Sequence, residues 1–321
     1  MLVFETCLAQ IQADCGLIPS AAAQAIAEGC ENFTPDYAAL TTGLLKDGVL
    51  GPGFIAALRQ TLPAEARHYL HFGATSQDLT DSALTYRLGY LLGMFDNLLA
   101  ALLNALDKLE QSQGSLKIMA QTRMQAALPI SVADKLASWQ RPLHRHQERL
   151  KALAPRLLVI QFGGPVGTRA ELGDKAEIIV ARLAARMNLG NAPCWHNARD
   201  NIVEFGNDLA LISGTLGKIG QDAALLAQTE NASLKIAGGG ASSAMAHKAN
   251  PVTAELLVAL ARYTAGLAGT LNQAMIHENE RSGAAWTLEW FTLPPLASAT
   301  AAALRHAVDL TRRLTFQPLA G

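Results

Sequence analysis

Residues 238–251 read GGGASSAMAHKANP and lie between two long stretches of helical periodicity. The three consecutive glycines leave the backbone with few steric restrictions. Two serines, a lysine and an asparagine follow, and Pro251 suits the first turn of the next helix. A closing active-site loop needs such a mobile segment with hydroxyls, one cation and one amide, but a Gly/Ser-rich connection between helices has the same composition. Composition alone leaves both interpretations open.

Apolar residues on both sides of this segment recur at spacings of three and four, which is the periodicity of a helix. The predicted long helices cover roughly residues 82–114, 131–154, 172–189, 200–234, 252–277 and 294–314. Short helices and turns are predicted for residues 1–80, and the best candidate for a strand, 157–162, is short. Because the long helices exceed the ~11–12-residue average, the sequence predicts an all-α fold built as a bundle.

The composition indicates extensive burial of apolar surface. Of the 321 residues, 50% are hydrophobic and 17% are charged, and several predicted helices are apolar on more than one face. Such helices are buried in a large core or between subunits. The net charge of −1 provides no basic field to attract nucleic acid, so we expect no nucleic-acid partner.

The N-terminus and the cysteines favour a cytoplasmic protein. The first residues lack the basic and apolar regions of a signal peptide, and Asp, Lys, Arg or Gln interrupts each long apolar run, so we expect no membrane span. Cys7, Cys15, Cys30 and Cys194 form no C-x-x-C pair, which favours free thiols. No sequence neighbour would obviously lower the pKa of these thiols, so we predict that the cysteines are structural.

The run Ser-Ser-x-Met-x-x-Lys-x-Asn-Pro at 242–251 resembles the signature loop of the fumarase/aspartase superfamily. The motif is specific because it is long and combines residue types that are unusual together. Ala241 and Ala246 stand where this loop usually has Gly and Pro, and neither difference removes a reactive group.

The resemblance covers about residues 7–314 and implies how the whole chain is organised. It implies a small helical N-terminal domain at 1–81, a central long-helix bundle of the fumarase/aspartase type at 82–314, and a tail at 315–321. The C-terminal helical domain that members usually carry would then be missing or shed. The family also implies a homotetramer whose active sites are shared between subunits.

Two polar segments resemble regions that bind substrate in this family. Thr75 and Ser76 belong to the first region, where short hydroxyl side chains would bond a substrate carboxylate. The same residues could cap a helix, and both roles are compatible because a helix N-terminus attracts anions. Gln161 opens a Gly-Gly-x-x-Gly-Thr segment that implies a second substrate-binding position, with a simple connection between helices as the alternative.

Thr122 and Arg123 occupy the place where the lyases of the family read Thr-His. An arginine keeps its proton, so Arg123 cannot act as a general acid or base, but it can clamp a carboxylate. The resemblance therefore favours the cycloisomerase branch, where this histidine is not retained. Arg281, in a Glu-Arg pair that matches the family, is a further candidate anion contact. The alternatives are an exposed surface position for Arg123 and a helix-terminal salt bridge for Arg281.

The signature loop implies the catalytic residues. By match, Ser242 takes the acid/base role with Lys248 as its catalytic partner, and Asn250 binds the carboxylate that gains charge. We expect no metal and no cofactor, because no H-E-x-x-H occurs and His144 and His146 are two residues apart, on different helix faces.

The resemblance implies a 3-carboxymuconate-type cycloisomerase of aromatic catabolism, which acts on a small anionic polycarboxylate. A muconate with a sulfonate group is a related candidate substrate. One alternative is an adenylosuccinate-lyase-like C–N lyase, which the missing histidine at Arg123 disfavours. Another is a non-catalytic helical scaffold, which would have no chemical need for Ser242, Lys248 and Asn250.

Overall fold

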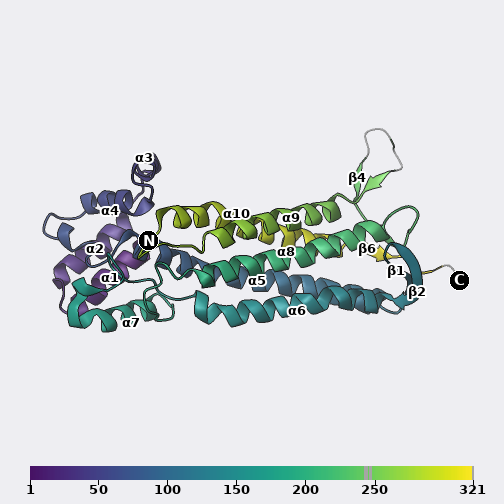
Figure 1. The fold of residues 1–321 in the computed structure, drawn as a ribbon, viewed down its shortest axis with the longest axis horizontal. Helices are drawn as coiled ribbons and strands as arrows, with labels where there is room; N and C mark the ends of the chain where they lie inside the picture. The colour runs from purple at the N-terminus through teal and green to yellow at the C-terminus, as the bar shows by residue number, and fades with distance from the viewer. Residues whose placement is uncertain (242–244, 246–247, 320–321) are drawn as a thin grey trace. The chain divides into compact units, whose positions relative to one another are not determined.

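A computed structural model describes residues 1–241, 245 and 248–319, and helices make up most of this chain (Figure 1). The long helices are α5 (Ser76–Gln113), α6 (Val132–Leu157), α8 (Asp200–Leu226), α9 (Val252–Gln273) and α10 (Gly283–Thr311). The shorter ones are α1 (Leu2–Asp14), α2 (Ser20–Asn32), α3 (Tyr37–Asp47), α4 (Leu50–Thr61) and α7 (Ala176–Arg186), with 3-10 turns η1 (Arg67–Tyr69) and η2 (Ala170–Lys175). The all-α prediction is confirmed.

Several of the predicted helices have different limits in the structure. The helix predicted at 82–114 begins six residues earlier, at Ser76, and the one predicted at 200–234 ends eight residues earlier, at Leu226. The helix predicted at 172–189 is divided: its first residues belong to η2, where Gly173 has the non-helical angles φ 55° and ψ −144°, and α7 begins only at Ala176. The helix predicted from residue 294 begins eleven residues earlier, at Gly283, and carries Pro294 and Pro295 inside it. Proline suits the first turn of a helix, whereas these two prolines lie in the interior of α10.

The described residues form two compact units. The first comprises residues 1–91, 154–201 and 275–286, and the second comprises 92–153, 202–274 and 287–321. Both units are assembled from segments that are separated in the sequence. The predicted division into consecutive domains at 1–81, 82–314 and 315–321 stays a prediction.

The first unit has a core in which α1 contacts α2 and α7. Phe4 on α1 stacks on Phe162 with ring centroids 6.2 Å apart, and both rings are fully buried. Residues Leu58 and Leu79 extend this core to α4 and to the start of α5. The core therefore fixes the segment around Phe162 beside the first turn of α5.

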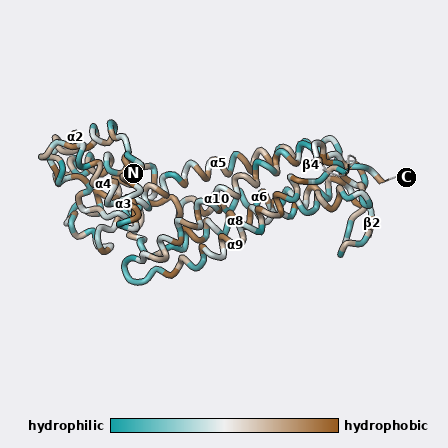
Figure 2. Tube along the Cα trace, turned by 90° about the horizontal axis from the view of Figure 1, so that it is seen from above, coloured by the Kyte–Doolittle hydropathy of each residue, from teal (hydrophilic) through white to brown (hydrophobic). Residues whose placement is uncertain are grey.

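In the second unit, small residues let the long helices approach closely. A Cβ on Gly220 of α8 would lie 2.5 Å from the Ala254 carbonyl oxygen of α9, so only glycine fits there. Elsewhere along α8, the hydroxyl groups of Ser213 and Thr300 lie 3.0 Å apart and connect α8 with α10. Hydrophobic and hydrophilic residues are interspersed along these helices (Figure 2).

The described residues also form three two-stranded sheets that the sequence patterns do not predict. The largest is an antiparallel hairpin of β1 (Lys117–Thr122) and β2 (Gln125–Ser131). Arg123 and Met124 connect the two strands with φ angles of 48° and 66°, which is the geometry of a type I′ turn. The other pairs are β3 (Leu234–Ile236) with β6 (Leu314–Phe316) and β4 (Gly240–Ala241) with β5 (Ala249–Asn250). The strand predicted at 157–162 was wrong, because only a single bridge forms there, between Val159 and Gly190.

Helix α5 differs from the expectation that no apolar run reaches the length of a membrane span. Among the helices of the described chain, α5 alone is long and apolar enough to cross a membrane by length and composition. Core helices of water-soluble proteins meet the same two criteria.

Candidate active site

Asp78 anchors the first turn of α5 to a neighbouring loop of the first unit. Its carboxylate accepts a hydrogen bond from the backbone N–H of Thr75 at 3.0 Å, which satisfies an amide that a helix N-terminus leaves unpaired. It also accepts the backbone N–H groups of Gly163 at 2.7 Å and Gly164 at 2.9 Å. The buried carboxylate therefore holds the Gly163–Gly164 turn beside the start of α5.

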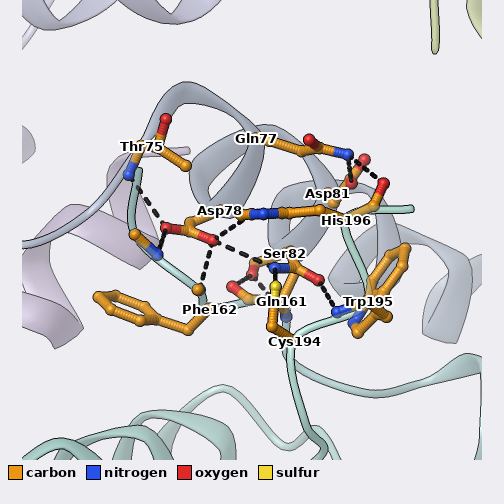
Figure 3. A network of polar contacts seen from close by, with 12 residues as sticks. Thr75, Gln77, Asp78, Asp81, Ser82, Gln161, Phe162, Cys194, Trp195 and His196 are labelled. Atoms are coloured by element: carbon orange, nitrogen blue, oxygen red, sulfur yellow. Dashed lines mark hydrogen bonds and ion pairs between the residues drawn. The ribbon is translucent and has the colours of Figure 1, made fainter. Parts of the chain in front are cut away.

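Two buried side chains also donate to Asp78. His196 Nε2 lies 2.9 Å and Gln161 Nε2 lies 3.2 Å from the Oδ1 atom (Figure 3). Burial alone would lower the pKa of His196, but its contacts with Asp78 and Cys194 raise that pKa to about 9. His196 is therefore protonated near neutral pH, and its charge compensates the buried carboxylate.

Gln161 is completely buried, and protein groups bind both ends of its amide. The Oε1 atom accepts the backbone N–H of Trp195 at 2.8 Å, and Nε2 donates to Asp78 and, at 3.3 Å, to the Cys194 sulfur. These are the contacts of a residue that positions loops. Direct substrate binding by Gln161 stays a prediction.

A second buried ion pair supports the next turn of α5. Arg199 donates to the two Asp81 carboxylate oxygens at 2.6 and 3.2 Å, and the indole N–H of Trp286 donates to Asp81 at 3.2 Å. The Arg199 guanidinium also lies 4.7 Å from the centre of the Trp195 ring. Three separated segments of the first unit are thus joined at one carboxylate.

Arg281 is held at the N-terminal end of α5 by neutral acceptors. It donates to the Thr75 hydroxyl, to the Gln77 side-chain oxygen and to the Pro165 carbonyl, each at 3.1 Å. Among the described residues it forms no ion pair, so the predicted alternative of a salt bridge is not observed there. A half-buried guanidinium without a carboxylate partner, next to a helix N-terminus, is suited to bind an anion.

The structure brings Arg281 and Thr75 into contact, and Ser76 is the next residue. Ser76 is half-buried, and its side chain packs so closely on Gly51 that a Cβ there would lie 2.6 Å from its Oγ. Two neighbouring hydroxyl groups, the N-terminus of α5 and the Arg281 guanidinium therefore lie together. These groups form the candidate anion site of the first unit.

The remaining predicted residues belong to the second unit. Thr122 ends β1 and Arg123 lies in the turn that follows, and both are exposed. Lys248 is exposed, and Asn250 in β5 pairs with Gly240 in β4. In Figure 1 the β1–β2 hairpin and β4 lie at the same end of this unit's helices. Ser242, the predicted acid/base, lies outside the described residues.

Sequence reasoning missed the network around Asp78. Asp78, His196 and Cys194 are not among the predicted site residues. The available signal was the combination of a first-turn aspartate with two glycines and a histidine far along the chain. Within the described part of the chain, no group of three His, Cys, Asp or Glu side chains could hold a metal ion.

Comparison with known proteins gives a consistent set of relatives. A family model described as a lyase matches residues 3–266. A 3-carboxy-cis,cis-muconate cycloisomerase from Pseudomonas aeruginosa is 39% identical over 98% of this chain and 70% of its own length. The enzyme of the same name from Acinetobacter baylyi is 36% identical over 97% of this chain and 71% of its own. The crystal structure of the 3-carboxy-cis,cis-muconate lactonizing enzyme from Pseudomonas putida has a TM-score of 0.92 at 37% identity, covering 98% of this chain and 72% of that one.

Proposed function

Because the chain belongs to the lyase family of the fumarase/aspartase superfamily, we propose that it is a cycloisomerase that converts 3-carboxy-cis,cis-muconate to carboxymuconolactone. The observation that carries this proposal is the similarity to enzymes of that name, at 36–39% identity over nearly the whole chain. The reaction belongs to aromatic catabolism, in the degradation of protocatechuate.

The reaction makes one C–O bond and one C–H bond. A carboxylate oxygen of the muconate adds to a double bond, and the electron pair of that bond moves to the neighbouring carbon. This carbanion is stabilised by spreading its charge into an adjacent carboxylate, and protonation then gives the lactone. Preorganised cations and hydrogen-bond donors must meet the developing charge.

Ser242 donates the proton in this proposal. An unassisted serine is a weak acid and base, so Lys248 and the exclusion of water are needed to stabilise its alkoxide. Asn250 binds the carboxylate that gains charge. The exposed ammonium group of Lys248 and the strand position of Asn250 beside Gly240 support these roles.

The other anionic groups of the substrate require cations that do not change protonation state. Arg281 with Thr75 and Ser76 would bind one carboxylate at the start of α5, and Arg123 with Thr122 would bind another. The support for Arg281 is its fixed position among three neutral acceptors. An arginine at 123 suits a tri-anionic substrate, because it adds charge where a histidine would add acid/base chemistry.

A cytoplasmic homotetramer with shared active sites is the assembly that fits this function. Large apolar side chains of the second unit are exposed on α8, α9 and α10, including Leu211, Tyr263 and Phe291. A groove of about 790 Å³ runs between α6, α8 and α9 and includes Leu211 in its lining. Further copies of this chain would cover such surfaces.

The proposal is tested by identifying the product. We would incubate the protein with 3-carboxy-cis,cis-muconate in D₂O and follow the reaction by proton NMR. The expected result is the lactone with one deuterium on the carbon next to a carboxylate. If the protein converts only a 3-sulfomuconate, the sulfonate is the substrate in place of the carboxylate. Release of fumarate from adenylosuccinate would favour the C–N lyase. If the protein converts none of these three compounds, the proposal is contradicted.

A further inference from the structure

The Cys194 sulfur lies in a cluster of polar groups that the proposed reaction does not use. Gln161 Nε2 donates to this sulfur at 3.3 Å. A Cβ on Gly163 would overlap the sulfur and lie 2.9 Å from His196 Cε1, so the thiol and the imidazole pack against the same glycine. Cys194 is partly exposed, whereas His196 is buried, with an exposed fraction of 2%.

The two ring nitrogens of His196 have different surroundings. Nε2 is committed to the Asp78 carboxylate at 2.9 Å. Nδ1 is buried and has no partner of regular hydrogen-bond geometry among the described residues. Nδ1 is therefore the ring nitrogen left to interact with the Cys194 thiol, which packs with the imidazole against Gly163. Thiol, imidazole and carboxylate form a continuous series, which is the arrangement that activates a cysteine nucleophile.

We propose that Cys194 is held as a thiolate by the His196 imidazolium and is a modification site for small, neutral, soft electrophiles. In the reaction with iodoacetamide, the sulfur electron pair forms an S–C bond as the C–I bond breaks, and iodide leaves with the bonding pair. The proton stays on His196. The sequence-based prediction that all four cysteines are structural is thereby replaced for Cys194.

The charges around the thiol support this state. Burial alone would raise the pKa of Cys194, but contacts with the side chain and backbone N–H of His196, and with Gln161, lower the pKa below its ordinary value. Asp78 on α5 keeps His196 protonated, and Arg169 donates to the Phe162 and Ala192 carbonyls on the two adjoining loops. By contrast, burial raises the thiol pKa of Cys7 and of Cys30.

The test is the pH dependence of alkylation in the native protein. We would react the protein with iodoacetamide between about pH 5.5 and 9.5, and quantify modification of Cys194 and of the partly exposed Cys15 by tandem mass spectrometry. The expected midpoint of the rate profile for Cys194 lies below ~8.5, the value of an ordinary thiol. A midpoint at or above that value, or no alkylation of Cys194 in the native protein, would overturn the proposal.

A variant separates the role of His196 from simple exposure. In His196→Gln an amide can still donate to Asp78 but cannot carry a charge, so the midpoint for Cys194 should rise while that for Cys15 stays the same. An unchanged Cys194 midpoint in the folded variant would contradict the imidazolium as the cause. If His196→Gln does not fold, the protonation state of Cys194 is measured in another way. The ultraviolet absorbance of the Cys194 thiolate is taken as the difference in absorbance between the native protein and Cys194→Ser over the same pH range. That difference should titrate below the ordinary thiol value, and titration at or above it would contradict the proposal.

Modification should also loosen the turn that Asp78 holds. The sulfur already touches Gly163, so an added group must displace the Gly163–Gly164 turn. We expect alkylation to lower the melting temperature of the native protein by several degrees and to leave that of Cys194→Ala unchanged. Equal melting temperatures of the modified and unmodified native protein would show that the turn accommodates the group. Neither measurement depends on the enzymatic activity.

Discussion

Arg281 shows how one side chain can be fixed without being neutralised. Three neutral oxygens accept its hydrogen bonds, so its position is set while its charge remains available for a ligand. A lysine would keep the charge, but its three N–H donors sit on one nitrogen and cannot reproduce the planar fork whose three nitrogens each reach a different acceptor. The residue type at 281 is therefore predicted to matter beyond its charge.

Replacing Arg281 tests this role. We expect Arg281→Lys to lower kcat/KM about tenfold or more, since a hydrogen bond to a charged group contributes roughly 1.5–3 kcal/mol. Steady-state kinetics with 3-carboxy-cis,cis-muconate would measure the effect. The matched control is Arg186→Lys, an exposed arginine whose side chain contacts Gln10. Equal kcat/KM values for the two variants would exclude Arg281 from substrate binding.

A second residue-scale feature is the pair of His71 and the buried Glu5, whose Nδ1 and Oε1 atoms lie 2.6 Å apart. Burial alone would lower the pKa of His71, but the charge and hydrogen bond of Glu5 outweigh it and raise the pKa, with Asp78 also raising it and Arg59 opposing. The folded-state pKa thus exceeds the unfolded value of ~6.5. The pair therefore stabilises the fold fully below that pH and loses its effect as the pH rises through the raised pKa.

We expect the free energy of unfolding to fall as the pH rises above ~6.5. Urea denaturation at a series of pH values would measure this slope, and His71→Gln should reduce it. His68→Gln, which changes an exposed histidine three residues away, should keep the native slope. An equal slope for the native protein and His71→Gln would show that the pair does not stabilise the protonated form.

At the scale of elements, the contact of α8 with α9 depends on glycine. A Cβ on Gly220 would lie 2.5 Å from the Ala254 carbonyl oxygen and 2.9 Å from the Leu257 Cβ, both on α9. A Cβ on Gly214 of the same helix would have no other atom within 4 Å. The two glycines therefore separate a packing requirement from helix propensity.

We expect Gly220→Ala to reduce the free energy of unfolding by about 1–3 kcal/mol, because overpacking forces the helices apart. In contrast, Gly214→Ala should raise it by roughly 0.5–1 kcal/mol, since alanine has the higher helix propensity. Urea denaturation of both variants at one pH measures the difference. Destabilisation of equal size in both would mean that the close approach of α8 and α9 is not the cause.

Periodicity predicted the elements that bury a stripe of apolar residues, and it failed where burial does not decide the structure. Helix α8 begins at Asp200 as predicted because an apolar repeat follows an acidic first residue. The β1–β2 hairpin was missed because residues 121–129 are exposed and carry no apolar alternation. Its turn also uses positive φ angles at Arg123 and Met124, where glycine or asparagine would have been the usual signal.

The candidate site was only partly predictable for a different reason. Thr75, Ser76 and Arg281 stood out through local motifs, and Arg281 and Thr75 do meet in the structure. The contact of Asp78 with His196 joins residues 118 positions apart, and no local pattern announces it. Contacts that depend on how loops return to a helix require the fold itself.

At the scale of the whole molecule, exposed apolar side chains on the second unit predict self-association. We expect sedimentation-equilibrium measurements to give four times the monomer mass of 34.0 kDa. Leu211→Glu should weaken the assembly, since it places a charge in the groove between α6, α8 and α9. Leu45→Glu is the matched control, because Leu45 is exposed on α3 in the first unit. A native protein that sediments as a monomer would contradict the shared-site assembly.

In the proposed reaction, this chain closes a lactone ring with Ser242 as its proton donor. The most direct measurement is the loss of diene absorbance of 3-carboxy-cis,cis-muconate on mixing with the native protein and, in parallel, with Ser242→Ala. We predict rapid loss with the native protein and a rate roughly 10²–10⁴-fold lower with the variant. Equal rates would exclude Ser242 as the acid, and a stable diene with both proteins would contradict the proposed activity on this substrate.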